Sequence, residues 1–379
     1  MNNININYIN YITYQFFPNE KANSLQTINT LNSFVEKGIQ VKLIYPDRDK
    51  LKDNKSIDKV YEIDSRVKII KTNHKLPFGK TKIFEKFFFI FSSLIWSVFA
   101  VLKYAPKNKK DLIYTRTPWV LLCSIFKKNI FIFECHKYSL SLKLVLKLVG
   151  NKDNVLLIFT NSFLKDYFKL ENKIFNNSLI VPSAFSETMF EKNSVKKIKK
   201  EVVFVGNLLR FNKDRNISFL INAFQSNELS DFKLSIIGGP DEYIASLKSE
   251  GLKNINFIGQ LSNRESLKIM QSAEIGILIN DSEDVHSYYH TSPLKFFEYI
   301  RANLKVVAVN FPSHKLLPFK KNITFFNQSD QKSFIQAILN SHKNVFHYDE
   351  GIHDFSYNRR TEIILAGLAR LEGLEPPTT

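Results

Sequence analysis

The stretch YYHTSPLKFFEYI, residues 288–300, predicts a helix that begins just beyond a buried strand. Ser292 is a favoured N-cap residue, and Pro293 suits the first helical turn because its missing N–H would have no partner there. Apolar residues then recur at helical spacing up to Ile300. The apolar run IGILI at 275–279 is typical of a buried strand. This part of the chain therefore predicts a strand–loop–helix unit of an α/β protein.

A helix that starts near the end of a strand offers main-chain N–H groups and a positive dipole end to a phosphate. Glu298 lies about two turns into the helix, roughly 7–8 Å along the axis from Pro293. A carboxylate at that distance can accept hydrogen bonds from the ribose of a nucleotide whose diphosphate sits on the helix start. The alternative interpretation is an ordinary capped helix with a surface glutamate.

The same residues carry a family resemblance. SPLKFFEY, followed by the expected strand 305–309, resembles the donor-site signature of GT-B glycosyltransferases, especially glycosyltransferase family 4. Many members carry two glutamates, of which Glu298 matches the second, while His290 stands at the position of the first. The resemblance implies two doubly wound, Rossmann-like α/β domains facing a cleft. It also implies retaining sugar transfer without a metal or another cofactor, with His290 holding hydroxyls of the donor sugar.

Composition limits the class of protein. The chain has 379 residues, enough for two domains of about 180 residues each. Its two cysteines, Cys123 and Cys135, lack metal-ligand spacing, which argues against a disulfide framework and favours a reducing cytosol. The polar start of the chain predicts no secretory signal. The net charge of +17 indicates either attraction to an anionic surface or a lysine-rich composition spread along the whole chain.

The first part of the chain predicts a parallel crossover unit. Residues 4–14 form a strand, a loop follows up to Ser24, a helical stripe ends at Gly38, and 41–45 form the next strand. This opening is similar to that of family 4, in which the first loop touches the acceptor. The resemblance therefore places Asn23 and Ser24 on the acceptor side.

Arg116 and His136 end two further expected strands, at the edge where open parallel sheets bind ligands. They resemble the Tyr-x-Arg and Glu-x-His elements of the family, in which the histidine reaches the sugar–phosphate linkage from the acceptor side. A core or surface histidine with no role in binding is the alternative for His136.

Residues 87–102, FFFIFSSLIWSVFAVL, carry no charge. Lysines flank them on both sides: Lys80, Lys82, Lys86 and Lys103. A membrane span needs about 20 apolar residues. Three interpretations stay open: a buried helix of the first domain, a helix lying in a bilayer interface with Trp96 and the lysines as anchors, and a true span. The strand expected at 112–114 continues the same sheet and argues against a span.

A second α/β series begins after the basic stretch KNSVKKIKK, residues 192–200, which predicts a hinge. Gly206 and Gly238 end two of its strands, where a glycine lets the main chain approach a ligand closely. The resemblance places a basic pair in the loop after Gly206, and Arg215 is nearest in register to its lysine. Fixed cations there would stabilise the charge that a diphosphate gains as the sugar bond breaks; solvated side chains are the alternative.

The expected organisation is an acceptor-side domain over 1–190, a linker over 191–200, a donor-binding domain over 201–354, and a crossing helix with a tail over 355–379. The residues expected to act in catalysis are His136, Arg210 and Arg215. Those expected to bind the donor are Gly206, Lys213, Gly238, His290, Thr291, Ser292, Leu294, Lys295 and Glu298, and those on the acceptor side are Asn23, Ser24 and Arg116.

The expected function is hexosyl transfer from a nucleotide diphosphate sugar to a lipid-linked or glycan hydroxyl in surface polysaccharide or glycolipid synthesis. The expected location is the cytoplasm. The inner face of an anionic membrane is an open alternative, with residues 87–102 and the flanking lysines as the contact. The alternatives are a nucleotide-sugar epimerase or hydrolase on the same fold and a basic, non-catalytic nucleic-acid-binding module. A basic sheet face with interleaved aromatic residues is not evident, so no nucleic-acid partner is expected.

Overall fold

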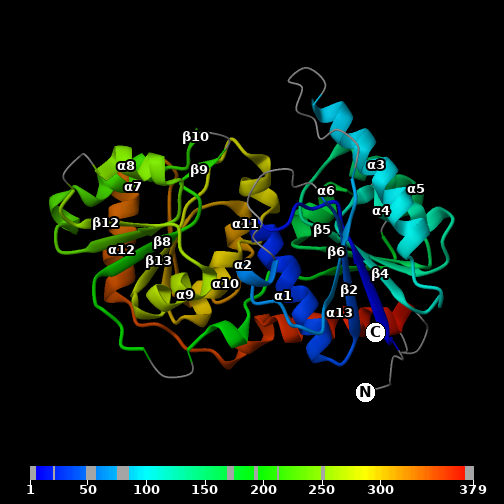
Figure 1. The fold of residues 1–379 in the computed structure, drawn as a ribbon. Coiled ribbons are helices and arrows are strands. Elements are labelled where there is room, and N and C mark those ends of the chain that lie inside the picture. Colours follow the sequence, from blue (N-terminus) through cyan, green and yellow to red (C-terminus); the bar gives the residue numbers. More distant parts are fainter. Residues whose placement is uncertain are drawn as a thin grey trace. The chain divides into compact units, whose positions relative to one another are not determined.

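The computed structural model describes residues 6–19, 22–47, 57–74, 85–168, 175–191, 195–210, 213–248 and 252–371. These residues form two compact units, which Figure 1 shows as ribbons. Unit 1 contains the described residues up to Pro182 and from Tyr357 onward, and unit 2 contains those from Ser183 to Ser356. The last helix of the chain therefore belongs with the first unit.

The observed boundaries differ from the expected ones at the hinge. The stretch expected as a linker, 191–200, lies inside unit 2, except for residues 192–194, which are outside the described residues. The main-chain N–H of Ile198 donates to the carbonyl oxygen of Ser272 at 2.8 Å. Lys196 and Lys199 are exposed, whereas Lys197 Nζ donates to the carbonyl oxygen of Ala302 at 2.6 Å. The chain changes units earlier, after Pro182.

Among the described residues, unit 1 holds a seven-stranded parallel sheet in the order β3-β2-β1-β4-β5-β6-β7. The strands are β1 (Tyr8–Ile12), β2 (Gln40–Pro46), β3 (Lys68–Thr72), β4 (Leu112–Thr115), β5 (Ile130–Cys135), β6 (Val155–Phe159) and β7 (Ser178–Ile180).

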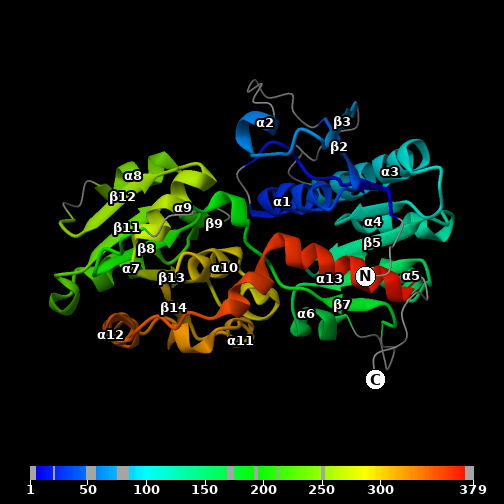
Figure 2. The same cartoon turned by 90° about the horizontal axis from the view of Figure 1, so that it is seen from below.

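Helices cover both faces of this sheet. On one face lie α1 (Ala22–Glu36), α2 (Ile57–Val60) and α13 (Tyr357–Leu371), and on the other α3 (Glu85–Tyr104), α4 (Pro118–Leu122), α5 (Leu140–Val149) and α6 (Ser162–Tyr167). The hydroxyl groups of Ser33 and Thr361, 2.6 Å apart, join α1 to α13, which run side by side in Figures 1 and 2. The apolar side chains of alternate strand residues fill the two layers between helices and sheet.

Among the described residues of unit 2, a six-stranded parallel sheet has the order β12-β11-β8-β13-β14-β15. Its strands are β8 (Glu201–Val205), β11 (Lys233–Ile237), β12 (Ile255–Gly259), β13 (Ile275–Leu278), β14 (Lys305–Val309) and β15 (Ile323–Phe326), and a small hairpin joins β9 (Leu209–Arg210) to β10 (Lys213–Asp214).

The helices of unit 2 also lie on both faces of their sheet. One face carries α7 (Ile217–Phe224), α8 (Asp241–Lys248) and α12 (Gln331–Lys343), and the other α9 (Asn263–Ser272) and α10 (Leu294–Arg301), while α11 (Pro312–Lys315) follows β14. The shorter helical segments are η1 (Cys123–Ile125), η2 (Glu187–Met189), η3 (Asn227–Leu229), η4 (His286–His290), η5 (Lys320–Asn322) and η6 (Glu350–Phe355). The structure thus confirms the predicted pair of doubly wound α/β units.

Each sheet reverses its direction of growth next to its first strand. The reversal falls between β1 and β4 in unit 1, and between β8 and β13 in unit 2. In open parallel sheets, ligands bind outside the carboxyl ends of the strands at this position. The residues that follow Ile12, Thr115, Val205 and Leu278 are therefore the first candidates for a functional site.

Candidate functional site

Helix α10 begins without a side-chain cap. Its N-cap is Pro293, so the expectation that Ser292 caps the helix is wrong. The Ser292 hydroxyl instead accepts a hydrogen bond from the Ser183 N–H at 2.9 Å, and the Ser183 hydroxyl donates to the Ser292 carbonyl oxygen at 2.6 Å. Ser292 thus anchors the loop before the helix. In the part of the chain that the structure describes, the N-cap side chain makes no hydrogen bond at the helix start, so the N–H groups of Leu294 and Lys295 present the positive end of the helix dipole.

Tyr299 fixes α10 where β8 and β13 separate. The last residues at which these two strands pair are Val203 and Gly276. Beyond them, the Tyr299 hydroxyl accepts from the Val205 N–H at 3.2 Å and donates to the Ile277 carbonyl oxygen at 3.4 Å. A Cβ atom on Gly276 would lie 2.6 Å from the Tyr299 ring, so glycine is required for the ring to pack against the strand. The helix is therefore held directly against the reversal point of the sheet.

Glu298 is buried, and because α10 begins at Leu294 it lies about one turn beyond the helix start, closer than the two turns expected. Lys295 Nζ donates to its Oε2 atom at 2.7 Å, which pairs the two charges on the same side of the helix. The alternative of a surface glutamate is therefore wrong. A carboxylate with an ammonium group on one oxygen can accept further hydrogen bonds on the other oxygen.

Arg215 spans the reversal point from the side of β8. Its Nη2 atom donates to the Asn280 Oδ1 atom at 2.7 Å, just after β13. A Cβ atom on Gly206, the residue after β8, would lie 3.2 Å from Arg215 Nη1. The guanidinium therefore lies across the carboxyl ends of both strands, the position expected for a cation that binds a phosphate.

The other residues of the basic loop lie in the hairpin β9–β10. Arg210 pairs with Lys213 across this hairpin, and their side chains are outside the part of the chain that the structure describes. Their expected role with the diphosphate stays a prediction.

Gly238 has a packing role. It adopts a positive φ of 143°, and a Cβ atom there would lie 1.9 Å from the carbonyl oxygen of Gly206. The close approach that selects glycine is thus between two strand-end loops of the protein itself. These loops form the rim beside Arg215.

His290 ends the π-helical turn η4 and is buried. Burial lowers the pKa of His290 below its usual value, so its imidazole is neutral near pH 7. Thr291 follows in extended conformation and leads into the Ser292 loop. The turn and the start of α10 therefore belong to one continuous segment.

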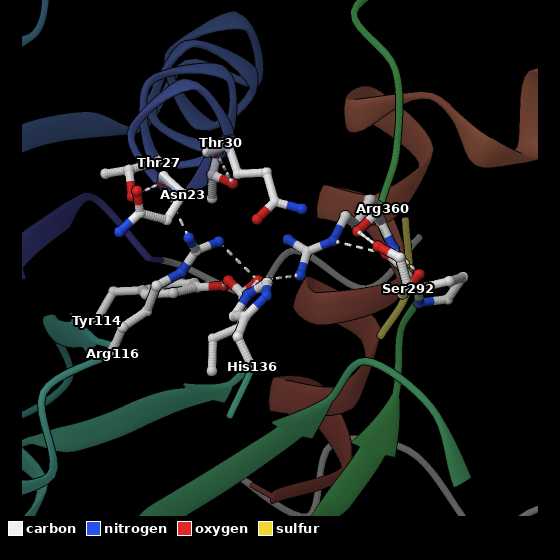
Figure 3. Close-up of polar contacts among 12 residues, drawn as sticks. Asn23, Thr27, Thr30, Tyr114, Arg116, His136, Ser292 and Arg360 are labelled. Carbon is white, nitrogen blue, oxygen red and sulfur yellow. Dashed lines mark hydrogen bonds and ion pairs between the residues drawn. The ribbon is translucent and has the colours of Figure 1, made fainter. Parts of the chain in front are cut away.

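In unit 1, four side chains contact the buried carboxylate of Glu134 on β5. Figure 3 shows these four, Tyr114, Arg116, His136 and Arg360, pointing toward one another. Arg116 Nη2 and Arg360 Nη2 donate to its Oε1 atom at 2.8 and 2.6 Å, and the Tyr114 hydroxyl donates to Oε2 at 2.5 Å. His136 Nε2 also contacts Oε1. Burial alone would raise the pKa of Glu134, but the two guanidinium groups hold it well below its usual value. The carboxylate is therefore ionised and shared by two buried cations.

His136 is neutral in this cluster. Burial and the neighbouring charge of Arg116 lower its pKa to about 4, against the opposing effect of Glu134. Because the Glu134 carboxylate is ionised, Nε2 must carry the proton and donate to it. The other ring nitrogen, Nδ1, is then an acceptor.

The acceptor-side candidates at the start of the chain lie on α1, which begins at Ala22, so the expectation of a loop up to Ser24 is wrong. Asn23 contributes its main-chain oxygen, which accepts from Arg116 Nη1 at 3.1 Å, while Ser24 is buried. Arg116 therefore donates hydrogen bonds to groups of the protein, the Asn23 carbonyl oxygen and the Glu134 carboxylate. Its geometry orients Glu134 and, through it, His136.

Sequence reasoning did not select Glu134, Tyr114 or Arg360 as site residues. A signal was present, because Glu134 is an ionisable residue inside the apolar strand Ile130–Cys135. A charge at such a position requires a buried partner. The partner Arg360 comes from the last helix, more than two hundred positions away. The segment 355–360 resembles the closing Ser-Trp-x-x-Arg helix of the family, but that resemblance does not indicate Glu134 as the partner.

Within the described ranges, no three histidine, cysteine or acidic side chains lie close enough together to hold a metal ion. The cysteines Cys123 and Cys135 are both buried and free.

Residues 199–344 match the family model described as glycosyl transferases group 1. The match covers most of unit 2, including Gly206, Arg215 and all of α10. No curated protein matches the chain. The family match favours sugar transfer over the two alternatives, an epimerase or hydrolase and a nucleic-acid-binding module.

Solved structures resemble nearly the whole chain. A glycosyltransferase from Rickettsia africae is 13% identical with a TM-score of 0.67, over 98% of this chain and 100% of that one. HepE of Anabaena, in complex with UDP and glucose, is 12% identical with a TM-score of 0.66, over 96% and 99%. A variant of TarM from S. aureus, in complex with fondaparinux, α-GlcNAc-glycerol and UDP, is 11% identical with a TM-score of 0.66, over 97% and 99%. At these identities the likeness concerns the fold, and it confirms the expected GT-B fold.

Replacing Glu134 tests the buried cluster of unit 1. Glu134→Gln leaves Arg116 and Arg360 buried without a counter-charge, and we expect a loss of about 3–5 kcal/mol in the free energy of unfolding. Urea unfolding followed by circular dichroism measures it. The control is Glu362→Gln, which removes partly exposed pairs with Lys37 and Arg359 and should cost less than about 1 kcal/mol. Equal losses of unfolding free energy in the two variants would contradict the assignment of Glu134 as the buried counter-charge of Arg116 and Arg360.

The protonation of His136 gives a second test. With a folded pKa of about 4 and an unfolded pKa near 6.5, the unfolded chain takes up the proton first as the pH falls. The contribution of His136 to stability is therefore complete above pH ~6.5 and declines as the pH falls toward 4. NMR titration, with His136→Gln to assign the ring resonances, should show a midpoint well below the usual value. A midpoint near 6.5 would show that the imidazole is not held neutral.

Proposed function

We propose that this chain, which has the GT-B fold and matches the group 1 glycosyl transferases over residues 199–344, transfers a sugar from a nucleotide diphosphate sugar to a hydroxyl acceptor. The single observation that carries the donor assignment is the start of α10, which has no side-chain cap and has a buried glutamate one turn further on. HepE and TarM were solved with UDP, so UDP is the nucleotide we propose to test first.

The diphosphate is assigned to the start of α10 and to Arg215. The N–H groups of Leu294 and Lys295 and the helix dipole favour an anion there. Arg215, fixed by Asn280, supplies a cation at the carboxyl ends of β8 and β13. Both are in place before the ligand arrives, so they stabilise the charge of the leaving diphosphate without reorganisation.

The ribose is assigned to Glu298. Lys295 occupies Oε2 of this carboxylate, and Oε1 is the oxygen that we propose for the ribose hydroxyls. Hydrogen bonds from hydroxyl groups to a carboxylate in an ion pair are charge-assisted, and they are stronger than those between neutral groups. This arrangement selects a nucleotide over an inorganic diphosphate.

His290 is assigned to the hydroxyls of the donor sugar. A neutral imidazole can donate from one nitrogen and accept at the other, which suits a hydroxyl group. Its place beside Thr291 and the helix start supports this role. We keep Gly206, Arg210 and Lys213 as donor-side residues of the same proposal.

The acceptor is assigned to unit 1, where Asn23, Ser24 and Arg116 surround the Glu134 cluster or lie next to it. His136 presents a neutral nitrogen that can accept a hydrogen bond from a hydroxyl. We propose a lipid-linked or glycan acceptor, in surface polysaccharide or glycolipid synthesis in the cytoplasm.

The proposed reaction retains the anomeric configuration and requires no metal. The acceptor oxygen forms a bond to the anomeric carbon as the bond from that carbon to the diphosphate oxygen breaks. The acceptor proton passes to the leaving phosphate oxygen. The positive groups on unit 2 stabilise the released diphosphate, a role that would otherwise fall to a metal ion.

Calorimetric titration with UDP and with inorganic pyrophosphate tests this assignment. Glu298→Gln should weaken UDP binding by about ten- to hundredfold, because hydrogen bonds to a charged acceptor are lost, and should leave pyrophosphate binding unchanged. The variant Arg215→Gln should weaken the binding of both UDP and pyrophosphate.

The matched control is Glu187→Gln, which removes the ion pair to Arg301 at the far end of α10. It should bind UDP like the wild type. Equal UDP affinity in the wild type and Glu298→Gln would refute the ribose assignment, and failure of the wild type to bind any of UDP, GDP and ADP would refute the donor assignment.

A further inference from the structure

Helix α3 has its polar and apolar faces reversed relative to a core helix. The side packed against the sheet carries Ser92, Ser93, Trp96, Ser97 and Ala100, all buried. The opposite side carries a stripe at helical spacing that is 40–63% exposed: Phe87, Phe91, Ile95, Phe99 and Leu102. Each of these five side chains keeps between two fifths and two thirds of its surface in contact with solvent, so folding of unit 1 gains less from it than from a core side chain.

Helix α5 has a second exposed apolar stripe. Leu140, Leu144 and Leu148 recur every four residues and are 71%, 64% and 66% exposed. Lys143 and Lys147 are exposed in an adjacent row along the same helix. The residues facing the sheet, such as Val145 and Leu146, fill the core without them. A leucine stripe with a lysine row beside it is typical of a helix that lies in a membrane interface.

The two stripes belong to one layer of unit 1. Helices α3, α4 and α5 pack on the same face of the sheet, with α4 in contact with both of the others, as Figure 1 shows. The segment after α4 adds Ile125 and Phe126, both exposed. We call the outer side of this layer the α3–α5 surface: Phe87, Phe91, Ile95, Phe99, Leu102, Ile125, Phe126, Leu140, Leu144 and Leu148.

Positive charges outnumber negative ones in the segments that carry this surface: residues 85–153 contain twelve lysines and arginines and four acidic residues, Glu85, Asp111, Glu134 and Asp153. Residues 86–110 contain no aspartate or glutamate, and the only acidic residue in 112–152 is Glu134, which is buried. Lys103, Lys128 and Lys147 are exposed around the surface. An apolar area bordered by lysines complements a bilayer with anionic headgroups, in which apolar chains lie beneath negative charge.

We propose that the α3–α5 surface docks unit 1 on the face of an anionic lipid bilayer. The helices lie parallel to the membrane plane, with the leucine and phenylalanine side chains among the acyl chains and the lysines among the headgroups. This proposal is independent of the donor assignment, because all its residues lie in unit 1.

Docking in the interface fits α3 better than a span does. Residues 87–104 are long and apolar enough to cross a membrane, and one third of them is buried. However, Trp96 Nε1 donates to Thr72 Oγ1 at 2.8 Å, and Trp96, Ala100 and Val101 belong to the core that packs on the sheet. Crossing the bilayer would remove these side chains from unit 1. The stripe also continues on α5, a helix of ten residues that is too short to span.

Vesicle flotation of the full chain tests the proposal. The wild type should float with vesicles of phosphatidylcholine and phosphatidylglycerol in equal parts, and less with phosphatidylcholine alone. The double variant L144Q/L148Q should bind the mixed vesicles at least about tenfold more weakly, because two leucines lose their transfer into the acyl region. The control Val345→Gln changes a side chain in unit 2 that is 75% exposed and should bind like the wild type.

The lysine row is tested separately by K143Q/K147Q. This variant should lose about tenfold or more in affinity for the mixed vesicles, as added salt should also cause, with little change on phosphatidylcholine alone. Thermal unfolding midpoints equal to that of the wild type show that the variants fold. Absence of wild-type flotation, or equal flotation of L144Q/L148Q and the wild type, would overturn the proposal. A dimer in sedimentation equilibrium that L144Q/L148Q dissociates would also overturn it, by showing that a second copy covers the surface.

Discussion

The contact between Tyr299 and the separating strands β8 and β13 determines the geometry of unit 2. Its hydroxyl bonds to the main chain of both strands where they no longer pair, and its ring lies on Gly276. A helix fastened at that point can only present its first turn to the carboxyl edge of the sheet. The position of Glu298 and the orientation of the N–H groups at the helix start follow from this packing. Tyr299 itself is not assigned a role in binding the donor.

In unit 1, ion pairs rather than aromatic packing hold the candidate site residues in place. Glu134 is buried inside a sheet strand, and its ionisation requires the two guanidinium groups that reach it from β4 and from α13. Removing these three charges from water is costly, and their mutual attraction and hydrogen bonds offset that cost. Because Arg360 lies on the last helix, this cluster also ties the end of the chain to unit 1.

The sequence allowed the fold and the donor segment to be predicted, because their signals are local. Alternating apolar strands and helical runs identify doubly wound units, and the segment around Pro293 identifies a helix start. Contacts between residues far apart in the chain could not be predicted from the sequence. The Ser183 N–H donates a hydrogen bond to the Ser292 hydroxyl, and Arg360 donates one to Glu134. Residues 87–102 were ambiguous for a related reason, since apolar content does not tell which face of a helix packs.

The central claim is that α10 and Glu298 hold a nucleoside diphosphate at the carboxyl edge of unit 2. A crystal structure of the chain with UDP tests it most directly. The account predicts diphosphate oxygens within hydrogen-bond distance of the main-chain nitrogens of Leu294 or Lys295, and ribose hydroxyls on the Glu298 carboxylate. Density for UDP at another place, or with its ribose on other side chains, would contradict the account.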